Sequence, residues 1–77
     1  RTTPPMEMSA PDAITLNGKA HPLAGQTPLN QLLESLGLAG KPVVVELNET
    51  AVFPRDYPQT SVHPGDRLEI VTLAAGG

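Results

Sequence analysis

The 77-residue sequence contains no cysteine and no tryptophan, and it has only one tyrosine and one phenylalanine. Without cysteine, the chain cannot form disulfides, thiolate metal sites, iron–sulfur clusters or a cysteine nucleophile. So few aromatic side chains give no platform on which single-stranded nucleic acid could stack. The core therefore has to be built from Val, Leu, Ile and Ala, and the protein needs no oxidising compartment.

Long apolar runs and a concentration of basic residues are also missing. No run approaches the roughly 20 apolar residues that span a bilayer, and the first residues show no basic region followed by an apolar segment. Five Lys and Arg are scattered among eight Asp and Glu, which gives a formal charge of -3. We expect a soluble, cytoplasmic protein that binds neither nucleic acid nor a membrane.

The length fits one domain near the lower limit for a single hydrophobic core. Residues 1–12, RTTPPMEMSAPD, are rich in Pro, Ser and Thr and show no apolar period, so we predict a flexible segment. Within it, Met6 or Met8 is a candidate natural start. The folded domain is predicted over residues 13–73, with a flexible tail, AAGG, at 74–77.

The stretch AITLNGKAHPL predicts a β-hairpin. Ile14 and Leu16 alternate onto one face, and Asn17-Gly18 is the pair best suited to the positive φ angles of a type I′ turn. The return strand is predicted over residues 19–23, where Pro22 is tolerated only near an edge or an end.

The stretch AGQTPLNQLLESLG predicts a helix. Thr27 is expected as the N-cap, Pro28 at the first helical position and Gly37 just beyond the last turn. The helix leucines recur at i, i+3, i+4 and i+7 and so gather on one face. They are Leu29, Leu32, Leu33 and Leu36.

The second half of the chain is predicted to form strands separated by turns. The β-branched run VVVEL predicts a buried strand, and HPGD predicts a turn that the Asp66 side chain stabilises. Tyr57 and Val62 are expected to point inward from an irregular connection. The predicted segments are a strand at 43–47, a turn at 48–49, a strand at 51–53, the connection at 54–62, the turn at 63–66 and a last strand at 67–73.

A hairpin, one helix and then further strands define an α+β arrangement. This order is the one that a β-grasp (ubiquitin-like) fold requires, with the last strand placed beside the first. We therefore predict a mixed sheet of four to five strands with one main helix.

Three segments in this order resemble the ubiquitin-like sulfur carriers, and most closely the ThiS family of thiamine thiazole biosynthesis. They are LNGKAHPLAGQTPLNQLLESLG, VVVELNETAVFPRDY and VHPGDRLEIVTLAAGG, and the resemblance spans residues 14–77. The middle segment favours this family over the molybdopterin-synthase small subunit, which shares the fold and the Gly-Gly end. One departure is Glu49-Thr50, where the family commonly has a glycine in the turn.

The resemblance implies a reaction scheme centred on Gly77. A ThiF-type adenylating enzyme would use Mg-ATP to convert the Gly77 carboxylate into an acyl-adenylate, and a cysteine desulfurase persulfide would supply sulfur to give a thiocarboxylate. The thiazole synthase ThiG would accept that sulfur. The chain would then be a protein co-substrate that binds no cofactor of its own, and not an enzyme.

Within this scheme the last residues have distinct roles. Gly77 carries the chemistry, while Ala74, Ala75 and Gly76 give clearance, because a backbone without bulky side chains approaches a nucleotide closely.

Alternation along the last strand suggests where partners dock. With Leu68 and Ile70 facing the helix, the opposite face is expected to carry a docking surface. Alternatively, its residues are covered by the amino-terminal segment or are ordinary exposed side chains. This face comprises Arg67, Glu69, Val71 and Leu73.

Other functions are kept as alternatives. The sulfur recipient could instead be molybdopterin or cysteine synthesis, or the chain could be a ubiquitin-like modifier. A third class is a β-grasp binding module whose Gly-Gly end is incidental. A metal site is not expected, because His21 and His63 lack neighbouring ligands at suitable spacing.

Overall fold

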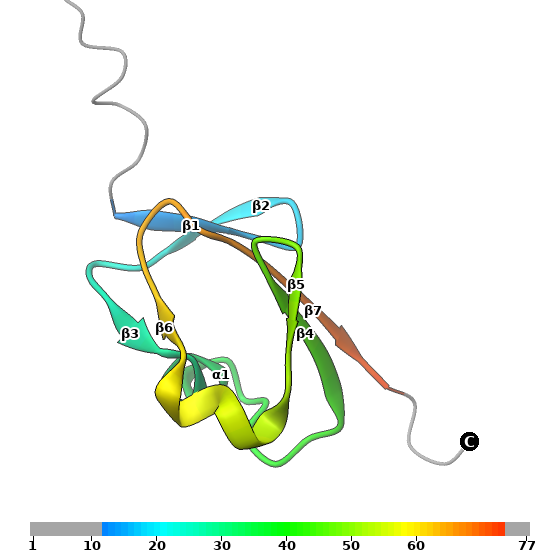
Figure 1. Ribbon diagram of the computed structural model, residues 1–77. Helices are drawn as coiled ribbons and strands as arrows, with labels where there is room; N and C mark the ends of the chain where they lie inside the picture. Colours follow the sequence, from blue (N-terminus) through cyan, green and yellow to red (C-terminus); the bar gives the residue numbers. More distant parts are fainter. Residues whose placement is uncertain (1–11, 74–77) are drawn as a thin grey trace, which may run out of the picture.

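The computed structural model describes residues 12–73 (Figure 1). Its main sheet has five strands in the order β2-β1-β7-β4-β5, and a second sheet pairs β3 with β6. None of the helices in this part of the chain is long and apolar enough to cross a membrane. The elements are β1 (Ala13–Leu16), β2 (Lys19–Pro22), β3 (Thr27–Pro28), α1 (Leu29–Ser35), β4 (Val43–Leu47), β5 (Thr50–Val52), the 3₁₀ helix η2 (Pro54–Gln59), β6 (Ser61–Val62) and β7 (Arg67–Thr72).

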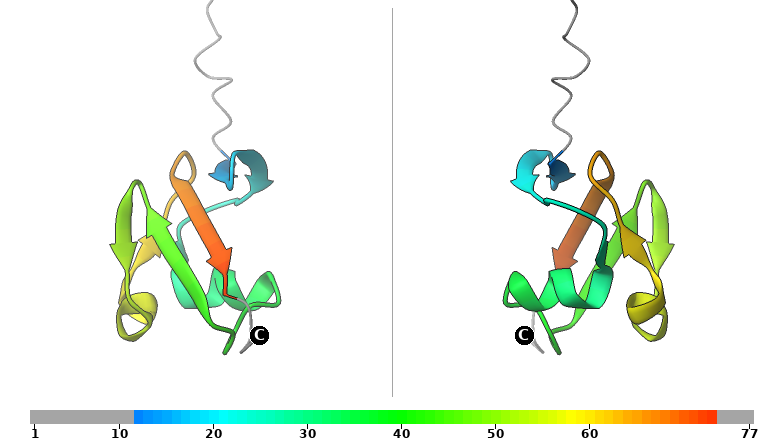
Figure 2. Two further views of the ribbon diagram at one scale, coloured as in Figure 1. Left: turned by 90° about the vertical axis from the view of Figure 1, so that its right-hand side faces the viewer. Right: turned by 90° about the vertical axis from the view of Figure 1, so that its left-hand side faces the viewer.

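The last strand is the centre of the main sheet. β7 runs parallel to β1 on one side and antiparallel to β4 on the other. Figure 2 shows α1 covering one face of this sheet, while no helix or strand of residues 12–73 covers the other face of β7 and β4. The predicted α+β, β-grasp architecture is therefore confirmed, including the last strand beside the first.

The amino-terminal hairpin forms as predicted. Asn17 and Gly18 have φ angles of 50° and 85°, as a type I′ turn requires. Pro22 lies at the end of the edge strand β2, opposite Ala13. The return strand stops there, one residue before the predicted end, and Leu23 is buried in the core instead.

The helix contributes the predicted leucine face. Leu29, Leu32 and Leu33 are buried, and Leu36 packs against them at the edge of the core. Gly37, with φ of 77°, ends the helix as expected. The Gly37 N–H donates to the Glu34 carbonyl and the Leu38 N–H to the Leu33 carbonyl, which is a Schellman motif. The core comprises Ile14, Leu23, Leu29, Leu32, Leu33, Val45, Val62, Leu68 and Ile70.

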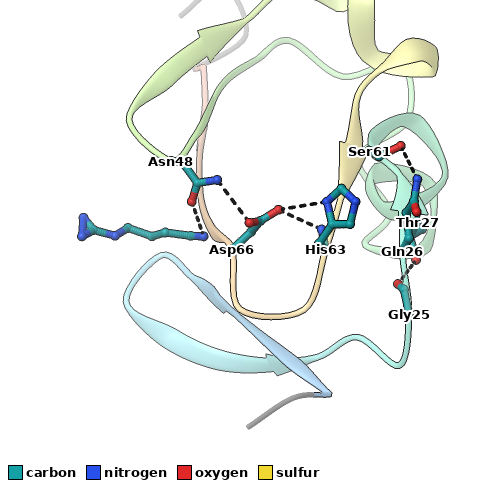
Figure 3. Close-up of polar contacts among 8 residues, drawn as sticks. Gly25, Gln26, Thr27, Asn48, Ser61, His63 and Asp66 are labelled. Carbon is teal, nitrogen blue, oxygen red and sulfur yellow. Dashed lines mark hydrogen bonds and ion pairs between the residues drawn. The ribbon is translucent and has the colours of Figure 1, made fainter. Parts of the chain in front are cut away.

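The start of the helix differs from the prediction. Thr27 is not the N-cap and Pro28 is not the first helical residue, because both belong to β3 and pair with β6. Pro28 is the N-cap and makes no side-chain capping bond. The Leu29 N–H donates to the Thr60 carbonyl at 2.7 Å, so a distant backbone group replaces the expected cap. The Thr27 hydroxyl donates instead to the Gly25 carbonyl (Figure 3).

The segment after β4 also differs from the prediction. β5 begins and ends one residue earlier than predicted, because Thr50 already pairs with Leu47 directly after the turn and the ladder ends at the pair of Val45 with Val52. Residues 54–59 form the 3₁₀ helix η2 where an irregular connection was expected. Val62 is fully buried and Tyr57 packs against the core, as predicted.

The HPGD turn is stabilised by Asp66, as predicted (Figure 3). The His63 N–H donates to Asp66 Oδ2 at 2.8 Å. Asn48 Nδ2 donates to Asp66 Oδ1 at 3.2 Å, and Asn48 Oδ1 accepts from the Arg67 N–H at 2.9 Å. These bonds join the β4–β5 turn to the turn that precedes β7.

Glu49 is the second residue of the turn between β4 and β5. Its φ of 71° lies in the left-handed region, which is strained for a residue with a side chain. Its ion pair with Arg67 is exposed and contributes little to stability.

We expect Glu49→Gly to raise the free energy of unfolding by about 0.5–1 kcal/mol, because relief of strain exceeds the entropic cost of glycine. Urea denaturation measures the change. The neighbouring Asn48→Gly is the matched control, and it should lower stability because it removes two side-chain hydrogen bonds. A less stable Glu49→Gly protein would contradict the prediction.

Candidate functional site

The predicted reactive residue and its spacer lie outside the described residues. These are Gly77, with Ala74, Ala75 and Gly76 before it. The structure does fix the residue that precedes them. Leu73 follows the central strand β7, and its N–H donates to the Pro42 carbonyl at 2.9 Å. The carboxyl-terminal residues therefore follow the central strand of the sheet, which is paired with β1 and β4.

Two asparagines hold β7, one from each flanking turn. The Asn17 side chain accepts from the Ile70 N–H at 2.8 Å and donates to the Ile70 carbonyl at 3.1 Å. It thereby continues the parallel β1–β7 pairing, whose last pair is Leu16 with Leu68. Asn48 binds the Arg67 N–H in a similar way. The sequence reading used Asn17 only for its backbone conformation. One feature of the sequence could have indicated these hydrogen bonds: each asparagine is the first residue of a two-residue turn that follows a strand.

The predicted outward face of β7 is exposed. Val71 and Leu73 are 59% and 49% accessible, while Leu68 and Ile70 are buried at 0% and 7%. Arg67 and Glu69 are exposed on the same face as Val71 and Leu73. The alternation of β7 is therefore as expected, and a docking role for this face stays a prediction.

Two further apolar residues extend this face, and the sequence reading missed both. Val44 pairs directly with Val71 across β4 and β7 and is also exposed. Phe53 follows β5, and continuing the β4–β5 register by one step places it opposite Val44. Within residues 12–73, the large exposed hydrophobic side chains are those of the outer apolar patch: Val44, Phe53, Val71 and Leu73.

An acidic pair borders the outer apolar patch. Glu46 lies directly opposite Glu69 in the β4–β7 register. Side chains so paired have Cβ atoms about 4.5–5.5 Å apart, and like charges at this spacing repel. Within residues 12–73 neither carboxylate forms an ion pair, and Arg67 on the same face is paired with Glu49 at 3.3 Å. The face therefore combines an apolar centre with uncompensated negative charge.

Histidine and carboxylate side chains do not converge into a metal site. Over residues 12–73, no three His, Asp or Glu side chains lie close enough together to hold a metal ion. His63 faces Asp66, with Nδ1 3.7 Å from Oδ2, and this contact belongs to the turn. The contact between His63 and Asp66 is therefore structural, and the exposed apolar face of β7 stays the candidate functional surface.

A β-grasp domain whose central strand is followed by a Gly-Gly sequence, with exposed apolar side chains on that strand within residues 12–73, is typical of ubiquitin-like carrier proteins. The model of the ThiS family matches residues 14–77, which is most of the chain. The chain belongs to the ThiS family. Among the alternatives raised by the sequence, this match supports the thiazole-pathway carrier.

Individual relatives agree with the family match. The chain is 41% identical over 64 residues to the sulfur carrier protein ThiS of Thermus thermophilus, covering 83% of this chain and 98% of that protein. It is 34% identical over 64 residues to a thiazole synthase of Paramagnetospirillum magneticum, covering 83% of this chain but only 20% of that protein. The crystal structure of ThiS from Geobacter metallireducens superposes with a TM-score of 0.73 at 31% identity, covering 84% of this chain and 99% of that one.

Proposed function

We propose that this ThiS-family protein, a sulfur carrier of thiamine biosynthesis, carries its sulfur on the carboxylate of Gly77. The observation that carries the proposal is the placement of Leu73. Leu73 directly follows the central strand, it belongs to the outer apolar patch, and it lies four positions before Gly77. The family match, which runs through residue 77, supports the same assignment.

The chemistry requires activation of the carboxylate. A carboxylate is a poor electrophile, so a ThiF-type enzyme first joins it to the α-phosphate of Mg-ATP and releases pyrophosphate. The terminal sulfur of a cysteine desulfurase persulfide then attacks the carbonyl carbon and expels AMP. A thiol cleaves the resulting acyl disulfide, leaving the thiocarboxylate and a new disulfide. In this scheme the chain binds no cofactor of its own and acts as a protein co-substrate.

Gly76 and Gly77 suit this reaction because they have no side chains to obstruct a narrow enzyme channel. The small Ala74 and Ala75 extend the unobstructed segment. The thiazole synthase then accepts the sulfur, and the thiazole synthase relative that includes a segment similar to this chain supports this partnership. Because the scheme consumes ATP, we place the reaction in the cytoplasm.

We assign the outer apolar patch to the adenylating enzyme. The patch includes Leu73, which directly precedes the carboxyl-terminal segment. An enzyme that binds this segment can therefore bury the exposed apolar side chains of the patch. The repulsion between Glu46 and Glu69 is relieved by a cationic side chain, so the partner surface should present Lys or Arg there. Arg67 and Glu69 then contribute to charge steering at the border of the patch.

The proposed function is tested by intact-protein mass spectrometry. Incubation with a ThiF-type enzyme, Mg-ATP, a cysteine desulfurase and cysteine should raise the mass by the difference between one sulfur and one oxygen atom. Addition of thiazole synthase and its other substrates should return the mass to its original value. An unchanged mass, with an active enzyme control, would falsify the proposal.

The outer patch is tested by Val71→Ser. Loss of one apolar side chain from a buried interface should lower kcat/KM for adenylation about tenfold, since its burial contributes about 1.5 kcal/mol. Stability should change by less than about 0.5 kcal/mol because Val71 is exposed. Pyrophosphate release reports the rate.

Thr72→Ser is the matched control for Val71→Ser. It removes a methyl group from the next residue, which alternation places on the other face of β7. Equal adenylation rates for the Val71→Ser protein and the unchanged protein would remove this face from the interface.

A further inference from the structure

Within residues 12–73, the second half of β7 has a neighbouring strand on one side only. Toward β4, the pairing continues to Val43 with Thr72 at the end of the strand. Toward β1, the pairing stops at Leu16 with Leu68, because the chain turns away at Asn17. Figure 1 shows β7 extending beyond the turn of the β1–β2 hairpin toward the carboxyl terminus. The central strand of the sheet therefore ends as an edge strand.

Backbone groups along β7 point alternately toward β4 and toward β1. On the β4 side, the Leu73 N–H donates to the Pro42 carbonyl. On the β1 side, the Ile70 N–H and carbonyl are both bonded to the Asn17 side chain. Thr72 lies two residues after Ile70, so its N–H and carbonyl also point toward the β1 side. No strand of residues 12–73 pairs with β7 there, and we call this position the unpaired edge.

The unpaired edge at Thr72 is accessible to a partner. Thr72 is exposed, although alternation places its side chain on the same face as the buried Leu68 and Ile70. The end of β7 thus extends beyond the part of the sheet that α1 covers. Asn17 marks where the unpaired edge begins, since its side chain takes the place of a further β1 residue. An exposed donor and acceptor on a strand edge form a template for an added strand.

The location of the unpaired edge indicates what binds it. Thr72 lies between Val71 and Leu73 of the outer apolar patch, five positions before Gly77. An enzyme that covers this patch and binds the carboxyl-terminal segment therefore lies directly beside the unpaired edge. An extended peptide backbone matches it chemically, because a residue facing Thr72 supplies both the acceptor and the donor.

We propose that an extended segment of the adenylating enzyme adds to the sheet as a strand beside Thr72, in line with β1 and beyond Asn17. The proposal rests on the proposed function, which assigns the outer apolar patch to that enzyme. The added strand pairs β7 on both sides as far as the residue before Leu73. Only the backbone of Thr72 takes part, so Thr72→Ser stays a suitable control for Val71→Ser.

Amide hydrogen exchange followed by NMR tests the pairing directly. In the free protein the Thr72 amide should exchange rapidly, whereas the Ile70 amide is protected by its bond to Asn17. Saturation with purified ThiF-type enzyme, without ATP so that no turnover occurs, should slow exchange at Thr72 at least tenfold. Unchanged exchange at Thr72 in the complex overturns the inference. Protection of Thr72 in the free protein also overturns it, because the edge would then already be paired.

Thr72→Pro tests the same contact in adenylation, because proline has no N–H to donate. Proline is tolerated where the N–H of an edge strand faces outward, so the free protein should melt within about 4 °C of the unchanged protein. Its kcat/KM for adenylation should fall about tenfold, since an acceptor of the enzyme loses its hydrogen bond. A larger loss of stability would show that the Thr72 N–H is bonded within the domain, and this would overturn the inference.

Ala20→Pro is the matched control on the other edge of the sheet. Leu16 with Lys19 flanks the two-residue turn and is a hydrogen-bonded pair, so the next pair, Thr15 with Ala20, directs the Ala20 N–H away from β1. Ala20 is exposed on the edge strand β2, away from the carboxyl-terminal segment. Ala20→Pro should therefore be adenylated at the normal rate.

The remaining outcomes separate this inference from the proposed function. A normal adenylation rate of Thr72→Pro overturns the inference, and so does an equal loss of rate in Ala20→Pro. The proposed function fails if the unaltered protein gains no sulfur in the mass assay. The inference alone fails if that protein is loaded normally while exchange at Thr72 is the same with and without the enzyme.

Discussion

Adding one alanine after Gly77 is expected to abolish thiocarboxylate formation while leaving the domain folded. The addition moves the carboxylate by about 3.3–3.6 Å along an extended chain and places a Cβ beside the new reactive carbon. A misplacement of about 1 Å already costs about 100-fold in rate, so no product should be detected in the mass assay.

The stability of the extended protein should be unchanged. The last described backbone contact before the added residue is that between Leu73 and Pro42, which the extension leaves in place. Thermal denaturation checks this, and one alanine added before Arg1 is the control that must still be loaded with sulfur. Sulfur loading of the protein extended after Gly77 would rule out a mechanism that requires the Gly77 carboxylate.

Asn17→Gly is expected to lower the free energy of unfolding by about 2 kcal/mol, or the melting temperature by about 8–16 °C. Glycine accepts the φ of 50° without strain, so the substitution isolates the side chain. What is lost is the pair of hydrogen bonds to the Ile70 N–H and carbonyl, which are partly buried. These groups then lack a partner beside the centre of the sheet.

Urea denaturation of Asn17→Gly and Asn48→Gly compares the two asparagines. The bonds made by Asn48 are exposed, and water replaces them more readily, so Asn48→Gly should cost less. If Asn17→Gly were as stable as the unchanged protein, the Asn17 side chain would have no role in holding β7.

Local chemistry was sufficient to predict much of this fold. Asn17-Gly18 specifies its turn through backbone conformation alone, and the helix leucines specify a buried face through their spacing. The start of α1 could not be predicted in this way. Thr27 pairs with Val62, which lies 35 positions later, and that distant strand determines the backbone bonds at the helix start.

The candidate site, too, could be predicted only in part. The exposure of Val71 and Leu73 follows from alternation within one strand, and the sequence predicted it. Their association with Val44 and Phe53 depends on strand order and register, which alternation does not determine. Tyr57 was predicted to point inward, but the burial of its hydroxyl without a hydrogen-bond partner in residues 12–73 depends on how η2 packs against α1.

The hydrogen bond between Leu73 and Pro42 joins the residue that precedes the carboxyl-terminal segment to the loop before β4. β7 is also paired with β1 on one side and with β4 on the other. Force that an enzyme applies to the carboxyl-terminal segment is therefore transmitted to the centre of the sheet and not to an edge strand.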